Sequence, residues 1–137
     1  MNPADGLGRT VWLALWPVGL AVGVGSLAIA RTTPGYGFAG ASPWAAAAAL
    51  AAGWALIAVG LIAWARRPTS RFGLLLAAGG FAWFLLEWNN PGIGSALGFT
   101  IGLVLSAVCP PLIAHAALAY PSGRLSGWPD RESRPLG

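Results

Sequence analysis

The sequence predicts an all-α integral membrane protein in which four transmembrane helices pack as a bundle. Hydrophobic residues form 56% of the 137 residues and charged residues only 9%, whereas soluble domains carry roughly 25% charged residues. The apolar residues gather in four blocks, each about as long as a bilayer core is thick. The basic residues fall between these blocks, and most of them lie on one side of a four-span arrangement.

The composition excludes several other classes of protein. An aromatic content of 11% is unlike that of a disordered chain, and a single cysteine cannot build a disulfide scaffold. The net charge is +4, but the basic residues are spread between apolar blocks and form no basic face for nucleic acid. The length fits one domain. We expect a transmembrane domain over residues 1–120 and a flexible cytoplasmic tail over 121–137.

The first span is predicted over residues 11–30. Twenty helical residues reach about 30 Å, which is enough for one crossing. Trp12 and Trp16 lie where an aromatic belt would place them, and Pro17 predicts a kink near the first turn. A cleaved signal peptide is the alternative, because residues 28–30 have the small side chains of a cleavage site. The length of the block and the spans that follow it favour a retained helix.

The second span is predicted over residues 44–64. Pro43 precedes it at a position where a helix tolerates a missing N–H group. Trp44 and Trp64 bracket the block like interface anchors, and alanine dominates its first half.

The third span, over residues 72–88, is close to the shortest that can cross a bilayer. It contains Gly79 and Gly80 in its middle and Glu87 near its end. Two asparagines, a proline and a glycine follow at 89–92, and these residue types end helices in turns.

The fourth span is predicted over residues 95–120. Pro110 and Pro111 lie inside it and predict a kink or break near 107–109, because each proline removes a backbone hydrogen bond.

The arginines give the orientation. Only Arg31 falls on one side of the four spans, which predicts that both termini are cytoplasmic in the plasma membrane. Without the third span, four arginines would lie on each side of the membrane. The uneven distribution of the arginines therefore supports the third span independently of its hydropathy. The arginines on the other side are Arg9, Arg66, Arg67, Arg71, Arg124, Arg131 and Arg134.

We expect no enzymatic activity, cofactor site or metal site in this chain. A catalytic triad needs a nucleophile, a base and an orienting acid. The chain has one histidine, and three of its four acidic residues lie in the terminal segments. Cys109 and His115 alone cannot supply the three or four ligands of a zinc site.

Glu87 and His115 are the candidate functional residues within the spans, because ionisable groups in a membrane are expensive and often functional. Glu87 could bind a proton, a cation or a basic ligand at the outer face. The alternative is a partly hydrated carboxylate at the interface. His115 could respond to pH, or it could stay neutral and hydrogen-bond within the bundle.

Glycines at four-residue spacing are candidate helix-packing residues, since small side chains let helices approach closely. Packing inside one bundle and packing between two copies of the chain both fit this pattern. The glycines are Gly19 and Gly23 in the first span, and Gly94, Gly98 and Gly102 at the fourth, where Ser106 continues the stripe.

Two segments resemble the N-terminal membrane region of actinobacterial sensor histidine kinases. Residues 65–76 contain an Arg-Arg-Pro turn that leads into a Gly-Leu-Leu helix. Residues 115–125 read His-Ala-Ala-Leu-Ala-Tyr-Pro-Ser-Gly-Arg-Leu, which is similar to the family's signature at the cytoplasmic face, with Tyr120 at the aromatic position and alanine replacing several leucines. The similarity touches about 25 residues directly.

The resemblance implies a sensory or anchoring region in a two-component system. Neither the dimerisation helix with the phosphoacceptor histidine nor the ATP-binding domain is contained in the chain, and His115 cannot be that histidine because it lies in an apolar helix. Arginines at the cytoplasmic headgroups would fix the helix depth. A shift of the fourth helix, allowed by Pro110 and Pro111, would pass to a linker beyond it. The interface arginines are Arg66, Arg67, Arg71 and Arg124.

Two alternative functions remain open at this point. A small four-helix transporter or channel subunit would have this size, with Glu87 as its membrane carboxylate. An accessory membrane protein would bind a partner protein, or form a homodimer, through its glycine faces. In each case the lipid bilayer is the main partner, and we expect no nucleic-acid partner.

Overall fold

The computed structural model describes residues 3–118, with side chains for 10–12 and 14–118. Within this part of the chain the long elements are four helices, and no strand is present. They are α1 (Pro3–Thr32), α2 (Pro43–Arg66), α3 (Arg71–Leu85) and α4 (Ala96–Leu118). Two 3-10 helices, η1 (Leu86–Trp88) and η2 (Pro91–Ile93), connect α3 to α4.

All four long helices are suited to crossing a membrane. Their apolar stretches are Thr10–Thr32, Pro43–Arg66, Arg71–Trp88 and Ala96–Leu118, and the third of these includes η1. The predicted all-α class and the presence of four helices suited to crossing a membrane are therefore confirmed.

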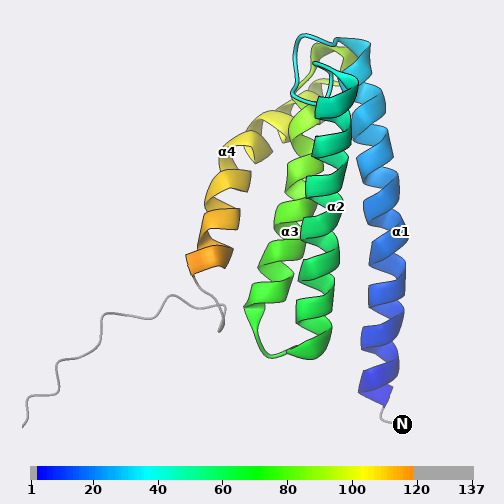
Figure 1. The fold of residues 1–137 in the computed structure, drawn as a ribbon, viewed down its shortest axis with the longest axis vertical. Helices are drawn as coiled ribbons and strands as arrows, with labels where there is room; N and C mark the ends of the chain where they lie inside the picture. Colours follow the sequence, from blue (N-terminus) through cyan, green and yellow to red (C-terminus); the bar gives the residue numbers. More distant parts are fainter. Residues whose placement is uncertain (1–2, 119–137) are drawn as a thin grey trace, which may run out of the picture.

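The helices lie side by side along the long axis of the molecule (Figure 1). The most extensive contact is between α2 and α3. On either side of this pair, α1 packs against α2 and α3, and α4 packs against α3, η1 and η2. The α1–α2 loop and the two 3-10 helices lie together at one end, and the α2–α3 turn lies at the other end, near the N-terminus (Figure 1).

Glycines bring the backbones of α2 and α3 into direct contact. A Cβ atom on Gly60 would lie 2.8 Å from the Cα of Ala77 and would overlap the backbone nitrogen of that residue. A Cβ atom on Gly73 would lie 2.6 Å from the carbonyl oxygen of Gly60 and 2.8 Å from the Cα of Trp64. Only glycine leaves room for this approach, because real Cβ atoms do not come so close to backbone.

A second close contact between α2 and α3 lies about two helical turns away from the first. A Cβ atom on Gly80 would lie 2.9 Å from the backbone nitrogen of Ile57 and 3.0 Å from the carbonyl oxygen of Gly53. Gly53 in turn accommodates the ring of Phe84, whose side chain is buried in the core with Ile57. The seven-residue spacing of both glycine pairs places them on one face of each helix. We call Gly53, Gly60, Gly73 and Gly80 the glycine seam.

Side chains that donate to backbone carbonyls connect each helix to its neighbour. Such bonds between membrane helices contribute about 0.6 kcal/mol each. They are Trp54 Nε1 to Gly19 O at 3.2 Å, Trp83 Nε1 to Ala49 O at 3.0 Å, and Cys109 Sγ to Gly79 O at 3.8 Å.

The prolines do not interrupt the helices. α1 is continuous through Pro17 and already starts at Pro3, before the predicted span. α4 is continuous through Pro110 and Pro111, so the predicted break near 107–109 is absent, although the helix bends along its length in Figure 1. Each proline leaves unsatisfied only the carbonyl four residues earlier, which a helix can tolerate in a membrane protein. The tail over 121–137 lies outside the described residues.

We expect opposite effects from alanine at two glycines. Gly60→Ala should lower the free energy of unfolding by about 1–3 kcal/mol, because the added methyl group pushes α2 away from α3. The matched control is Gly25→Ala on α1, where the Cβ position has nothing within 4 Å. This control should raise stability by about 0.5–1 kcal/mol, because alanine favours a helix over glycine. Reversible unfolding in mixed detergent micelles measures both, and equal losses at the two positions would contradict the seam.

Candidate functional site

The carboxylate of Glu87 lies beneath the α1–α2 loop. Glu87 is half-buried in η1, immediately after α3. Its Oε1 atom accepts a hydrogen bond from the backbone N–H of Ala39 at 3.2 Å. Its Oε2 atom is buried and has no hydrogen-bond partner among the described residues. The loop therefore fixes one carboxylate oxygen and leaves the other buried.

The loop reaches this position because of a glycine. A Cβ atom on Gly37 would lie 3.0 Å from the carboxyl carbon of Glu87 and would overlap its Oε2 atom. Ala39, two residues later, is buried and directs its N–H group at the carboxylate. Glycine at 37 therefore allows the loop to close over the acid.

Asn90 links the same end of the molecule to α1. Its side chain is 1% exposed, and its Nδ2 atom donates to the carbonyl oxygen of Ile29 in the last turns of α1 at 3.3 Å. Its Oδ1 atom accepts from the N–H of Gly92 at 2.8 Å and so shapes the turn into η2. Asn90 thus ties the segment after Glu87 to α1.

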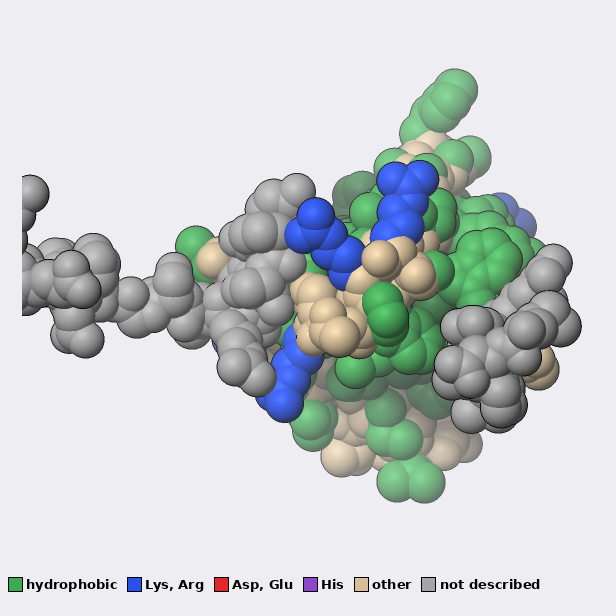
Figure 2. Space-filling view, turned by 90° about the horizontal axis from the view of Figure 1, so that it is seen from below, with side chains coloured by type: hydrophobic (Ala, Val, Ile, Leu, Met, Phe, Trp, Pro, Cys, Tyr) green, Lys and Arg blue, Asp and Glu red, His purple; other side chains and the backbone are tan. Residues whose placement is uncertain are grey.

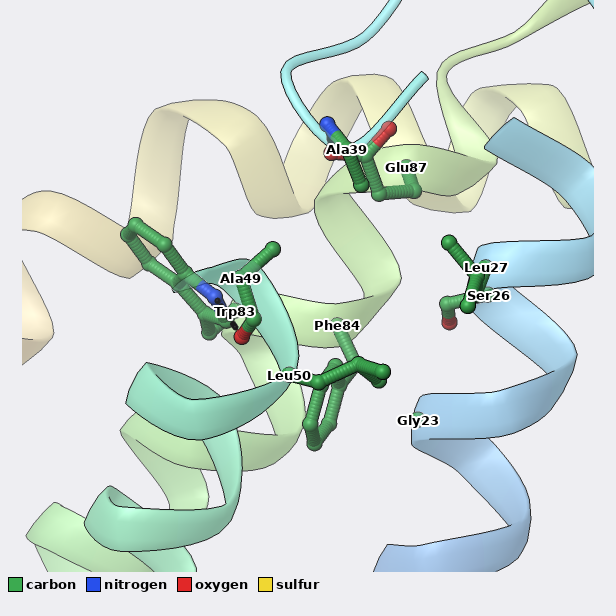
Figure 3. Close-up of a pocket in the computed structure, with 9 residues that line it drawn as sticks. All are labelled: Gly23, Ser26, Leu27, Ala39, Ala49, Leu50, Trp83, Phe84 and Glu87. Atoms are coloured by element: carbon green, nitrogen blue, oxygen red, sulfur yellow. Dashed lines mark hydrogen bonds between the residues drawn. The ribbon is translucent and has the colours of Figure 1, made fainter. Parts of the chain in front are cut away.

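A small cavity lies next to Glu87 (Figure 3). Its volume of about 10 Å³ is close to the minimum that one water molecule needs. Ser26 lines it from α1, is 1% exposed, and has a hydroxyl group without a partner among the described residues. The lining residues are Gly23, Ser26, Leu27, Ala39, Ala49, Leu50, Trp83, Phe84 and Glu87.

Arginines gather at the opposite end of the molecule. Arg66 ends α2, Arg67 caps it by donating its backbone N–H to the Ala63 carbonyl at 3.0 Å, and Arg71 begins α3. All three arginine side chains are exposed, and Figure 2 shows blue basic side chains gathered at this end of the molecule. Ser70 caps α3 by accepting from the N–H of Phe72. Arg124 lies outside the described residues.

The structure does not bring His115 to Glu87. His115 is half-buried in the last turn of α4, whereas Glu87 lies next to the segment from which α4 starts. Pro110 and Pro111 are exposed on the same half of α4 as His115. The candidate residues therefore fall into two separate regions and do not form one site.

Four of the predicted packing glycines contact other parts of the same chain. Gly19 faces Ile57, and Gly23 faces the rings of Trp54 and Phe84. These contacts place α1 against α2 and α3.

The glycines of the fourth span divide into two kinds. Gly98 faces the Ile93 side chain, and Gly102 lies against the backbone of Trp88 and Asn89. Gly94 was predicted to pack between helices, but it precedes α4 and has nothing within 4 Å of its Cβ position. It ends η2 with a φ of 66°. Its role is to adopt the left-handed conformation that favours glycine.

Sequence reasoning missed Ser26, Gly37 and Ala39 as parts of the Glu87 site, and it missed the glycine seam. The seam had a signal, because Gly53 and Gly60 repeat the seven-residue spacing of Gly73 and Gly80. Ala39 had none, since it acts through its backbone N–H.

No protein-family model, curated protein or solved structure shows detectable similarity to this chain. Within residues 3–118, no three histidine, cysteine or acidic side chains come together as a metal site. This end of the molecule therefore contains a carboxylate oxygen and a hydroxyl oxygen that are both buried without a hydrogen-bond partner among the described residues.

Glu87→Gln should weaken the bond to the loop, because a neutral amide oxygen accepts a weaker hydrogen bond than a carboxylate. We expect the amide proton resonance of Ala39 to move upfield in NMR spectra of the protein in lipid nanodiscs. Ser106→Ala is the control, because the Ser106 hydroxyl bonds within its own helix to Leu103 O. An Ala39 resonance that is unchanged in Glu87→Gln would show that the loop does not contact the carboxylate.

Proposed function

We propose that this chain is a membrane sensory and anchoring region, comparable to the input part of a two-component sensor histidine kinase. In this proposal the four helices form a bundle in the plasma membrane, with both termini cytoplasmic. The observation that best supports it is the position of α4. This helix packs on α3 and on the 3-10 segment that holds Glu87, and it leads toward the arginine-rich end.

The packing of α4 suits a helix that moves. Only 17% of its span is buried inside the protein, against 33% for α2 and for α3. Its first half lies with Gly102 against the backbone at Asn89, and its later half contains Pro110 and Pro111 and contacts α3 through Cys109. A displacement of η1 would therefore reach α4 directly, and a shift of this helix by 1–2 Å is a common form of signal transfer.

The arginines support the proposed orientation. Arg66, Arg67 and Arg71 lie at one end of the described structure, and Arg31 lies at the other, in the last turn of α1. In this proposal the α2–α3 turn faces the cytoplasm, as the positive-inside rule favours. Anionic lipid headgroups would attract these side chains and hold the helices at a fixed depth.

A small transporter or channel subunit is the second candidate, because Glu87 has a buried carboxylate oxygen without a partner among the described residues. The adjoining cavity of about 10 Å³ has room for one water-sized ligand and not for a larger substrate. Because the cavity is too small for a larger substrate, we favour the sensory role over transport.

The gene beyond codon 137 tests the kinase proposal. We expect an open reading frame that continues into a helix with a phosphoacceptor histidine and then an ATP-binding domain. A stop codon directly after residue 137 would contradict the kinase role and leave a stand-alone membrane protein.

In the full-length protein, replacing Pro110 and Pro111 together by alanine should change autophosphorylation by about fivefold or more, which is the lower end of ordinary coupling between sites. The control is Pro43→Ala, at the exposed start of α2, where proline is merely tolerated. An unchanged rate in the double variant, with normal membrane insertion, would show that α4 does not transmit the signal through this region.

A further inference from the structure

Two adjacent prolines leave one backbone carbonyl of α4 without a helical partner. A helical carbonyl accepts from the N–H group four residues later, or from the one three residues later in a 3-10 turn. For Ala107 these positions are Pro111 and Pro110, and neither has an N–H group. For Ser106, the N–H group of Cys109 is still present three residues later. The proline pair therefore isolates the carbonyl of Ala107.

No neighbouring side chain replaces the missing donor. The hydroxyl group of Ser106 donates its one hydrogen to the Leu103 carbonyl at 2.6 Å, and Cys109 donates to the Gly79 carbonyl at 3.8 Å. α4 is α-helical throughout, without the π turn that would bring in the N–H group five residues later. Within residues 10–118, no side chain donates to Ala107.

Ala107 lies on the outward side of α4, at the middle of its span. At 3.6 residues per turn it lies about 160° around the helix from the buried Cys109, and its side chain is exposed. α4 lies at the edge of the molecule, where it packs against α3, η1 and η2 (Figure 1). Ala107 is the central residue of the apolar stretch Ala96–Leu118, so about 16 Å of helix separates it from either end.

A carbonyl in this position requires a donor from outside the chain. In the hydrocarbon core of a bilayer an unpaired backbone carbonyl is strongly unfavourable, because lipid tails have no hydrogen to donate and water is absent. Membrane helices tolerate proline where a neighbouring helix supplies the lost hydrogen bond. Here the neighbouring helix, α3, lies on the opposite side of α4 from Ala107.

We propose that the outward face of α4 around Ala107 docks the transmembrane helix of another protein, one that carries a hydroxyl or amide side chain at mid-membrane. This side chain donates to the Ala107 carbonyl. The rest of the face is apolar, with Leu103, Val104 and Val108 all exposed. One polar contact among apolar ones then fixes the depth at which the partner helix packs, because any other register leaves both polar groups unpaired.

A second copy of the chain does not supply the donor through this face. A two-fold pair sets the same surface of each copy against the other, so α4 would lie on α4. The carbonyl would then face positions 107–111 of the other copy, which are alanine, valine, cysteine and two prolines. Cys109 is the one side-chain donor among them, and it is buried and already donates to Gly79. A different protein is therefore the occupant that the hydrogen bonding favours.

The inference requires α4 to cross a bilayer, which its length and composition suit, and it does not depend on the sensory role. The test is solid-state NMR of the protein in lipid bilayers, with carbonyl-labelled alanine and nitrogen-labelled valine. Alanine precedes valine at Ala21, Ala58 and Ala107, so this labelling selects three carbonyl resonances. Ala21 and Ala58 lie in uninterrupted helix and act as references. We expect Ala107 to resonate upfield of both, because its carbonyl has no hydrogen bond.

The probe is a leucine-rich transmembrane peptide with one central asparagine, and its matched control has leucine at that position. The asparagine peptide should move the Ala107 resonance downfield and leave the references in place, whereas the leucine peptide should move none of them. Pro111→Ala returns an N–H group to the Ala107 carbonyl, so its resonance should start downfield and ignore the peptide. Pro110→Ala returns an N–H group to the Ser106 carbonyl and should keep the response.

Two results would overturn the proposal. An Ala107 resonance that coincides with the references before any peptide is added would show that the protein itself, or a second copy, already satisfies the carbonyl. Equal effects of the asparagine and leucine peptides would show that this face recognises no donor. If either proline variant fails to fold, the comparison of the two peptides on the wild-type protein still decides the question.

Discussion

The close contact between α2 and α3 is the interaction on which the other helix contacts depend. In a bilayer, apolar side chains gain little by leaving lipid for another helix, so association depends on tight packing and on hydrogen bonds. The glycine seam lets the two backbones touch at Gly60 and Gly73. At this separation the ring of Phe84 fits against Gly53, and Trp83 reaches the Ala49 carbonyl. α1 then packs on both helices of this pair, and α4 packs on α3.

The two ends of the molecule differ in their chemistry. One end has exposed arginines on short, capped turns, which suits contact with lipid headgroups. The other has a carboxylate and an amide, Glu87 and Asn90, that hold the loop and α1 through backbone groups. A ligand or a change in the membrane at this second end would act on η1 and then on α4. The sensory proposal rests on this arrangement.

The sequence was sufficient for the fold class, because the thickness of the bilayer limits each span and composition alone reveals it. It was not sufficient for the contacts between helices. Gly94 matches the spacing of Gly98 and Gly102 but ends η2 instead, because a turn requirement and a packing requirement both select glycine. The partner of Glu87 is a backbone N–H at Ala39, which any residue type except proline could provide. The prolines of α4 predicted a kink or break, whereas α4 is continuous and bends along its length.

The most direct test of this account is solid-state NMR of the protein in lipid bilayers with labelled glycine and alanine. The glycine seam predicts a contact between the Cα atoms of Gly60 and Ala77, which are 17 positions apart in the sequence and belong to different helices. A cross-peak between these two atoms would support the pairing of α2 and α3 as the organising interaction. Its absence, with both residues assigned and helical, would contradict it.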